Sequence, residues 1–129
     1  MVVDDEERPV PLPGPVLRVV SIVPSLTEAV AATDRNLLVG ATDWCTHPAD
    51  LDVVRVRGTK NPDVERIVAL RPDLVLANAE ENRPPDLDAL RAAGVAVYVT
   101  DIRTLDGAFA ALRRMLDTGA LRAGRYQGA

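Results

Sequence analysis

The segment DWCTHP, residues 43–48, contains the only tryptophan, the only cysteine and the only histidine of this 129-residue chain. Trp44, Cys45 and His47 belong to residue types that stack on ligands, act as nucleophiles or bind metals. A structural zinc site needs about four protein ligands and a catalytic zinc site about three, so one cysteine and one histidine argue against a protein-built metal site. A Cys–His nucleophilic pair is disfavoured too, because no third group that would orient the histidine can be identified.

Segments typical of strands and of helices alternate from residue 18 onward. Short apolar runs rich in β-branched residues predict strands, and amphipathic or capped segments between them predict helices. Because the strands are apolar on both faces, the sequence predicts an α/β fold: a single-domain, Rossmann-like lobe with a parallel sheet between two helical layers. The predicted strands are 18–23, 37–42, 53–58, 73–78 and 95–100, and the predicted helices are 25–32, 62–71, 85–94 and 104–116.

Capping patterns predict where three of these helices begin or end. Ser25 followed by Glu28 has the spacing of a capping box, which makes Ser25 the expected N-cap of the first helix. Asn61 followed by Pro62 predicts an N-cap with proline at the first helical position of the second. Gly94 is expected to close the third helix.

The two ends of the chain differ in composition from its centre. Residues 1–17 are acidic and then rich in proline, which predicts a flexible leader that favours polyproline II, and 117–129 are predicted to be a flexible tail. The folded lobe is therefore expected at 18–116. The start of the chain does not resemble a signal peptide, and no apolar run approaches the roughly 20 residues of a membrane span. The sequence predicts a cytoplasmic chain without membrane insertion.

The charge of the chain is concentrated at its start. Four acidic residues at 4–7 account for the whole formal net charge of −4, because the other acidic residues equal the 15 basic residues in number. The predicted lobe is thus close to neutral and has no basic stripe. Nucleic acid is therefore excluded as an expected partner.

In open parallel sheets, ligands bind outside the carboxyl ends of the strands. The residues that follow the predicted strands are therefore the expected binding residues. For Trp44 the alternative is a hydrophobic cap on the sheet edge, and the run at 80–83 is by itself typical of a solvated loop. Neither a G-x-G-x-x-G nor a G-x-x-x-x-G-K-[ST] motif is present, which argues against a nucleotide-binding enzyme. The expected ligand-binding residues are Ser25, Trp44, Thr59, Asn78, Arg83 and Asp101.

Four segments carry a resemblance to a known family. They are RVVSIVPSLTEAV, VGATDWCTHP, GTKNPDVERIVALRPDLVLANAEENR and AGVAVYVTDIRT. Together they resemble the N-terminal lobe of the ABC-transporter solute-binding proteins for cobalamin and iron–siderophore complexes, also called helical-backbone metal receptors. The resemblance extends from residue 18 to about residue 116.

The resemblance implies two α/β lobes joined by a long helix, with the ligand in a shallow cleft between them. The metal arrives inside the corrinoid or ferric siderophore, so no resident cofactor and no protein-built metal site are implied. Trp44 matches an aromatic position that lies against the ligand, and Glu65 matches an acidic residue that docks on arginines of the membrane permease. For Glu65 a simpler role is also open, because an acidic residue in the first turn of a helix stabilises the macrodipole.

Three departures from the family pattern bear on these implications. Thr59 and Asn78 stand where cobalamin binders often have aromatic residues, the start carries no export signal, and the sequence stops where a linker helix would lead to a second lobe. Two alternatives to a solute-binding lobe therefore remain. One is a truncated module without autonomous binding, and the other is a small cytosolic α/β enzyme, which the sequence favours least.

Overall fold

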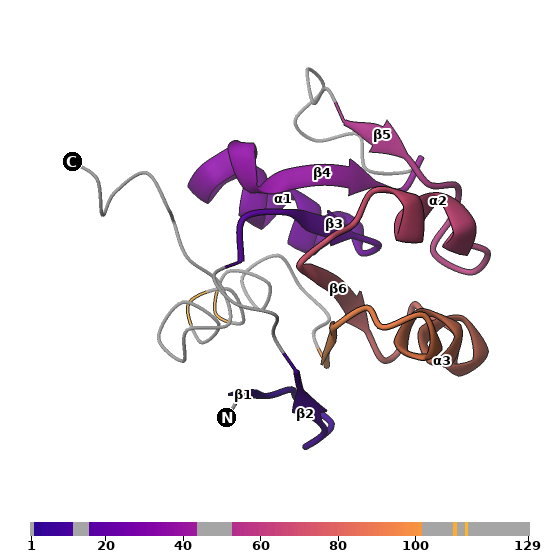
Figure 1. Ribbon diagram of the computed structural model, residues 1–129. Helices are drawn as coiled ribbons and strands as arrows, with labels where there is room; N and C mark the ends of the chain where they lie inside the picture. The colour runs from indigo at the N-terminus through magenta and orange to yellow at the C-terminus, as the bar shows by residue number, and fades with distance from the viewer. Residues whose placement is uncertain (1, 12–15, 44–52, 102–109, 111–112, 114–129) are drawn as a thin grey trace.

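The structure is a computed structural model, and it describes residues 2–11, 16–43, 53–101, 110 and 113. Five strands form a parallel sheet with the order β5-β4-β3-β6-β7 (Figure 1). This arrangement confirms the predicted α/β fold with a parallel sheet. The strands are β3 (Val19–Ser21), β4 (Leu38–Ala41), β5 (Val54–Arg55), β6 (Leu74–Asn78) and β7 (Val97–Thr100).

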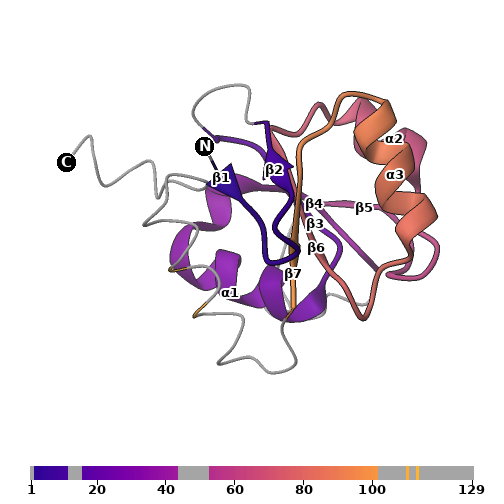
Figure 2. The ribbon, with the colours of Figure 1, turned by 90° about the horizontal axis from the view of Figure 1, so that it is seen from below.

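Helices cover both faces of this sheet, as Figure 2 shows from below. Helix α1 (Pro24–Asp34), continued by the 3-10 helix η1 (Arg35–Leu37), packs on one face, and α2 (Val64–Ala69) and α3 (Pro84–Ala92) pack on the other. None of the helices in the described part of the chain is long and apolar enough to cross a membrane.

The strands β3, β4, β6 and β7 contribute to two separate apolar clusters because successive side chains point to opposite faces. Val19 and Leu76 pack with α1, whereas Val20 and Val75 pack with Ile67 of α2 and with α3. Burial on both faces explains why the sequences of these strands are continuous apolar runs rather than alternating patterns.

The path of the chain creates a switch point in the middle of the sheet. From β3 the chain moves outward through β4 to β5, then returns to the other side of β3 as β6 and continues to β7. The helix that follows β3 lies on one face and the helix that follows β6 lies on the other (Figures 1 and 2). In open α/β sheets such a point is the usual place for a ligand crevice.

Two predicted helix starts are wrong. Helix α1 begins one residue earlier, with Val23 as N-cap and Pro24 in the first turn, so Ser25 lies inside the helix and does not cap it. Helix α2 is capped by Asp63, whose carboxylate accepts the backbone N–H of Arg66 at 3.1 Å. Asn61 and the following proline precede this helix because the proline pairs with Arg57 in an isolated β-bridge.

The end of α3 agrees with the prediction. Gly94 has a φ of 87°, a left-handed conformation that is accessible to glycine without strain, and it follows directly on the C-cap residue Ala93. The predicted helix at 104–116 lies almost wholly outside the described residues, and the predicted tail at 117–129 lies entirely outside them.

The expected flexible leader is wrong for residues 2–11, which form a hairpin on the sheet. Strands β1 (Val2–Val3) and β2 (Pro9–Val10) pair antiparallel, and the turn between them lies against the outer edge of β7. Val10 and Val16 are buried in the cluster on the α1 face. The composition of residues 1–17 did not reveal the contact with β7, because Val99 lies 95 residues from Asp4 in the sequence.

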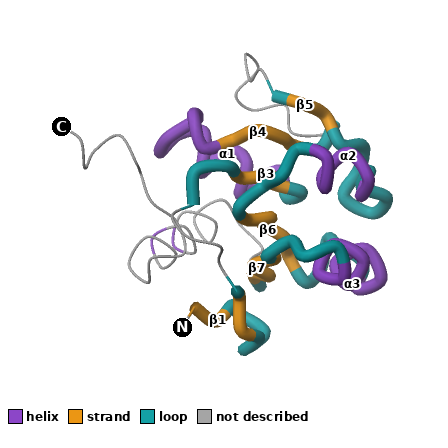
Figure 3. The backbone as a smooth tube through the Cα atoms, viewed as in Figure 1, coloured by secondary structure: helices purple, strands orange, loops and turns teal. Residues whose placement is uncertain are grey.

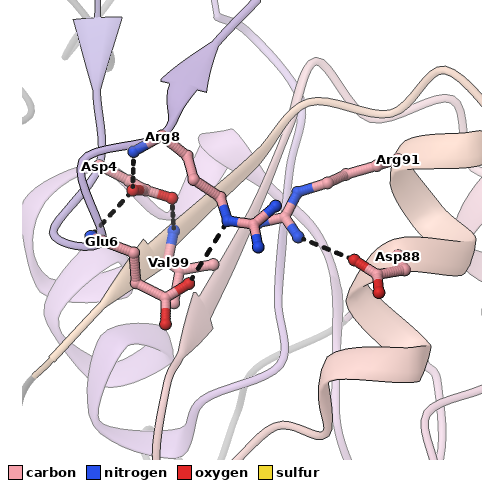
Figure 4. Close-up of polar contacts among 6 residues, drawn as sticks. All are labelled: Asp4, Glu6, Arg8, Asp88, Arg91 and Val99. Atoms are coloured by element: carbon pink, nitrogen blue, oxygen red, sulfur yellow. Dashed lines mark hydrogen bonds and ion pairs between the residues drawn. The ribbon is translucent and has the colours of Figure 1, made fainter.

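Asp4 fastens the hairpin to the sheet (Figure 4). Its carboxylate is 5% exposed, and Oδ1 accepts the backbone N–H groups of Glu6 at 2.9 Å and Arg8 at 3.0 Å. Oδ2 accepts the N–H of Val99 at 3.2 Å, and the N–H of Asp5 donates to the Val99 carbonyl at 3.0 Å. The hairpin thus satisfies polar groups that the edge strand would otherwise expose.

Replacing Asp4 by alanine is expected to destabilise the lobe. Asp4→Ala removes the acceptor of three backbone N–H groups, one of them on a buried strand, so the free energy of unfolding should fall by about 1–3 kcal/mol. Urea unfolding followed by circular dichroism measures this change. Glu6→Ala is the matched control, because its exposed ion pair with Arg8 contributes about 0–1 kcal/mol. Equal effects of the two substitutions would contradict the role given to Asp4.

Candidate functional site

The loops that follow the parallel strands gather along one edge of the sheet, which we call the rim. The rim comprises residues 22–25, 42–43, 56–63, 78–83 and 101, and its loops are drawn in teal in Figure 3. All five strands run parallel, so their carboxyl ends face the same side. The expected binding residues that the structure describes therefore lie along one edge of the sheet.

The turn from β3 into α1 is held by buried hydroxyl groups. Thr27 Oγ1 donates to Ser21 Oγ at 2.7 Å and lies 3.0 Å from the carbonyl oxygen of Val23. The Ser21 hydroxyl in turn lies 3.0 Å from that same carbonyl oxygen and accepts the Val23 N–H at 3.4 Å. These bonds take the place of a side-chain N-cap and set the position of Ser25, which is half-buried in the first turn of α1.

Asn82 joins three segments of the rim. Its side-chain Oδ1 accepts the backbone N–H of Asn78 at the end of β6, at 2.8 Å. Its Nδ2 group donates to the carbonyl of Ile22 after β3, at 3.1 Å, and to the carbonyl of Thr59 after β5, at 3.0 Å. The residue is 3% exposed. We call this set of three bonds the Asn82 clasp.

Asn82 is not among the residues expected from the sequence, because it lies in a charged run that is typical of a solvated loop. The structure corrects that interpretation for this residue. Asn82 is the one uncharged residue in the run at 80–83, and an amide supplies both the acceptor and the donors that the surrounding backbone groups need. That single difference in residue type was the available signal.

Further bonds connect neighbouring rim loops. Lys60 Nζ donates to the Glu80 carbonyl at 3.0 Å, which links the same two loops as the Asn82 clasp. On the β4 side, the Asp43 N–H donates to the Arg57 carbonyl at 2.8 Å. On the β7 side, the Asp101 N–H donates to the Asp5 carboxylate at 3.0 Å. The rim is therefore bonded from β4 across to the N-terminal hairpin.

The expected binding residues differ in how accessible they are on this rim. Arg83 and Asp101 are exposed, and Ser25 and Thr59 are half-buried. Asn78 is 2% exposed, and its side-chain Nδ2 lies 3.4 Å from a Glu81 carboxylate oxygen. Its position is that of a supporting residue beneath the surface. Trp44 lies outside the described residues, as do Cys45 and His47.

The switch point of the sheet lies between β3 and β6. At this place the Asn82 side chain bridges the carbonyl of Ile22 and the N–H of Asn78. Within residues 2–11, 16–43 and 53–101, no group of three or more metal-binding side chains is found.

A cavity of about 270 Å³ lies elsewhere, between the hairpin and the carboxyl end of α3. Arg91 is its only charged lining residue and donates to Asp88 at 3.3 Å. The remaining walls are prolines, valines and a glycine, so this cavity shares no residue with the rim. Its lining residues are Pro9, Pro11, Arg91, Gly94, Val95 and Val97.

Comparison with known proteins relates this fold and rim to one family. A family model described as periplasmic binding protein matches residues 19–118. The vitamin B12-binding protein of Vibrio cholerae serotype O1 is 34% identical over 96 residues, which is 73% of this chain and 35% of that protein. The chain thus spans about a third of the length of the curated relatives that it matches.

Solved structures show the same relationship. A periplasmic haem-binding protein from Pseudomonas aeruginosa is similar with a TM-score of 0.72 and 30% identity, over 82% of this chain and 39% of that one. The periplasmic vitamin B12 binding protein of Vibrio cholerae is similar with a TM-score of 0.67 and 28% identity, over 88% of this chain and 48% of that one. These relatives are named as binding proteins, which confirms the prediction that this chain is not an enzyme. The chain belongs to the periplasmic binding protein family and corresponds to part of the length of its members.

Proposed function

We propose that this chain is a solute-binding lobe that holds a metal-containing tetrapyrrole, cobalamin or haem, across its rim. The observation that carries the proposal is the Asn82 clasp, which bonds the loops after β3 and β5 to the end of β6. A broad, rigid ring fits a surface of connected loops better than a nucleotide, which needs open backbone N–H groups at a glycine-rich turn and helix N-terminus. The named relatives bind vitamin B12 or haem, and both ligands contain such a ring.

The polar groups of the rim suit the periphery of such a ligand. Arg83 and Lys60 are exposed cations, and Asp101 is an exposed anion at the β7 end. Haem carries carboxylates and cobalamin carries amides and a phosphate around the ring, so both offer partners to side chains of this kind. The expected stacking of Trp44 on the ring remains part of the proposal.

The metal of such a ligand is cargo and enters already bound in its ring. We propose that the contacts of this lobe are to the organic periphery of the ligand. A single lobe supplies one side of the two-lobed cleft that the family resemblance implies. The affinity of this chain alone is therefore expected to be lower than that of a two-lobed protein.

Equilibrium dialysis against cyanocobalamin, haemin and a ferric hydroxamate siderophore, followed by visible absorbance, tests the proposal. We expect the protein to retain one of the two tetrapyrroles. Arg83→Ala should weaken retention about 3- to 10-fold, and Trp44→Ala should weaken it at least as much, through lost rim contacts. Arg35→Ala is the matched control, because Arg35 is an exposed arginine in η1 at the opposite edge of the sheet.

Retention of the siderophore alone would replace the proposed ligand class. Retention of none of the three would favour a module without autonomous binding.

The family is named for the periplasm, whereas the cytoplasmic location expected from the sequence stays a prediction.

Glu65 is proposed to dock the lobe onto a membrane permease. It is exposed in the first turn of α2, next to Arg66, which forms an ion pair with Asp63. A carboxylate at this position also interacts with the amino end of the helix, so docking and helix stabilisation are compatible roles.

Glu65→Gln separates the two roles of this residue. Loss of the helix interaction alone should lower the free energy of unfolding by about 0.3–1 kcal/mol. Docking predicts, in addition, that ligand retention is unchanged while stimulation of the permease ATPase in lipid nanodiscs is lost. Glu28→Gln is the control, because it removes a carboxylate from another helix, α1, and leaves Glu65 in place. Equal ATPase stimulation by wild type and Glu65→Gln would exclude the docking role.

A further inference from the structure

We infer that Asn82 is a positioning residue that fixes the rim as one rigid surface before any ligand binds. The inference rests on the proposed function for its consequence in binding, but the coupling itself is a property of the unliganded chain. Asn82 bonds to Ile22, Thr59 and Asn78, which follow or end three different strands. No expectation from sequence assigned it a role.

The side-chain amide of Asn82 uses its oxygen and its NH₂ group in the clasp. The two Nδ2 hydrogens serve two carbonyls from different loops, and Oδ1 serves the Asn78 N–H, so one buried amide satisfies three backbone groups. These groups lie at or beyond the carboxyl ends of β3, β5 and β6. Without the clasp they would need water as a partner, and the loops after β3 and β5 would lose their direct bonds to Asn82.

Asn82 lies next to the residues that are expected to contact the ligand and holds them in position. Arg83 is the next residue in the chain, Thr59 contributes the carbonyl that Asn82 holds, and Ser25 follows Ile22 by three residues. Asn82 itself is buried, so it does not present its side chain to the ligand. Its effect on binding therefore acts through the position of these neighbours, by reducing the ordering that the ligand would otherwise have to impose.

Asn82→Asp isolates the two donor bonds. The substitution preserves the shape and the oxygen that accepts from Asn78 but removes both hydrogens that hold Ile22 and Thr59. Asn82→Ala removes all three bonds. Leu90→Ala is the control for stability, since Leu90 is fully buried in α3 and takes no part in the three bonds of the clasp.

Amide hydrogen exchange of the unliganded protein gives the direct readout. In Asn82→Asp we expect the amides of residues 22, 23, 25 and 57–61 to exchange about tenfold faster than in wild type, with the Asn78 amide still protected. In Asn82→Ala the Asn78 amide should lose protection as well. In Leu90→Ala any acceleration should follow the global stability and should not concentrate on these loops.

The inference is overturned if the loops at 22–25 and 57–61 keep wild-type exchange in Asn82→Asp, or if they accelerate only as much as in Leu90→Ala. Should Asn82→Ala not fold, the comparison of Asn82→Asp with Leu90→Ala decides alone. With cyanocobalamin and haemin as probes, Asn82→Asp should weaken the binding that wild type shows about tenfold, and Leu90→Ala should not. A wild type that binds neither probe would overturn the proposed function, while the exchange result would still decide the clasp.

Discussion

Three backbone groups at or beyond the carboxyl ends of β3, β5 and β6 take a hydrogen-bond partner from one side chain. Inside a sheet each N–H and C=O is paired by a neighbour, but the strands diverge as they leave it, and an unpaired buried polar group is costly. The chain meets this constraint with one buried amide, Asn82, and with the Ser21 and Thr27 hydroxyls beside it. The bonds of Asn82 that satisfy these backbone groups also connect three segments of the rim.

The opposite problem, an exposed sheet edge, is solved by the N-terminal hairpin. β7 is the last strand of the sheet, and its outward N–H and C=O groups would be open to pairing with another chain. The carboxylate of Asp4 and the backbone of Asp5 occupy this edge at Val99, and the Asp5 carboxylate continues the cover to Asp101. The cluster of acidic residues that made the start of the chain look solvated thus contains the two side chains that attach it to the fold.

What the sequence could predict depended on how far apart the interacting residues lie in the chain. Apolar runs gave the five strands of the sheet, and the closure of α3 by Gly94 was predictable because these features are local. The features that could not be predicted from the sequence depend on partners that are far away in the chain. Asn82 meets a carbonyl 60 residues away, and Asp4 meets an amide 95 residues away, so no window of sequence shows either bond. The predicted caps at Ser25 and Asn61 failed for a related reason, since the β3–α1 turn and the Arg57–Pro62 bridge decide where the helices begin.

Strand and helix alternation alone would have allowed a nucleotide-binding enzyme as readily as a binding lobe. The difference lies in a few atoms at the switch point, where a dinucleotide fold leaves backbone N–H groups open at a glycine-rich turn. Here the turn after β3 carries Pro24 and the space beside it holds the Asn82 amide. The Asn82 amide at the switch point and the family membership are independent observations, and both support the solute-binding lobe proposed for this chain.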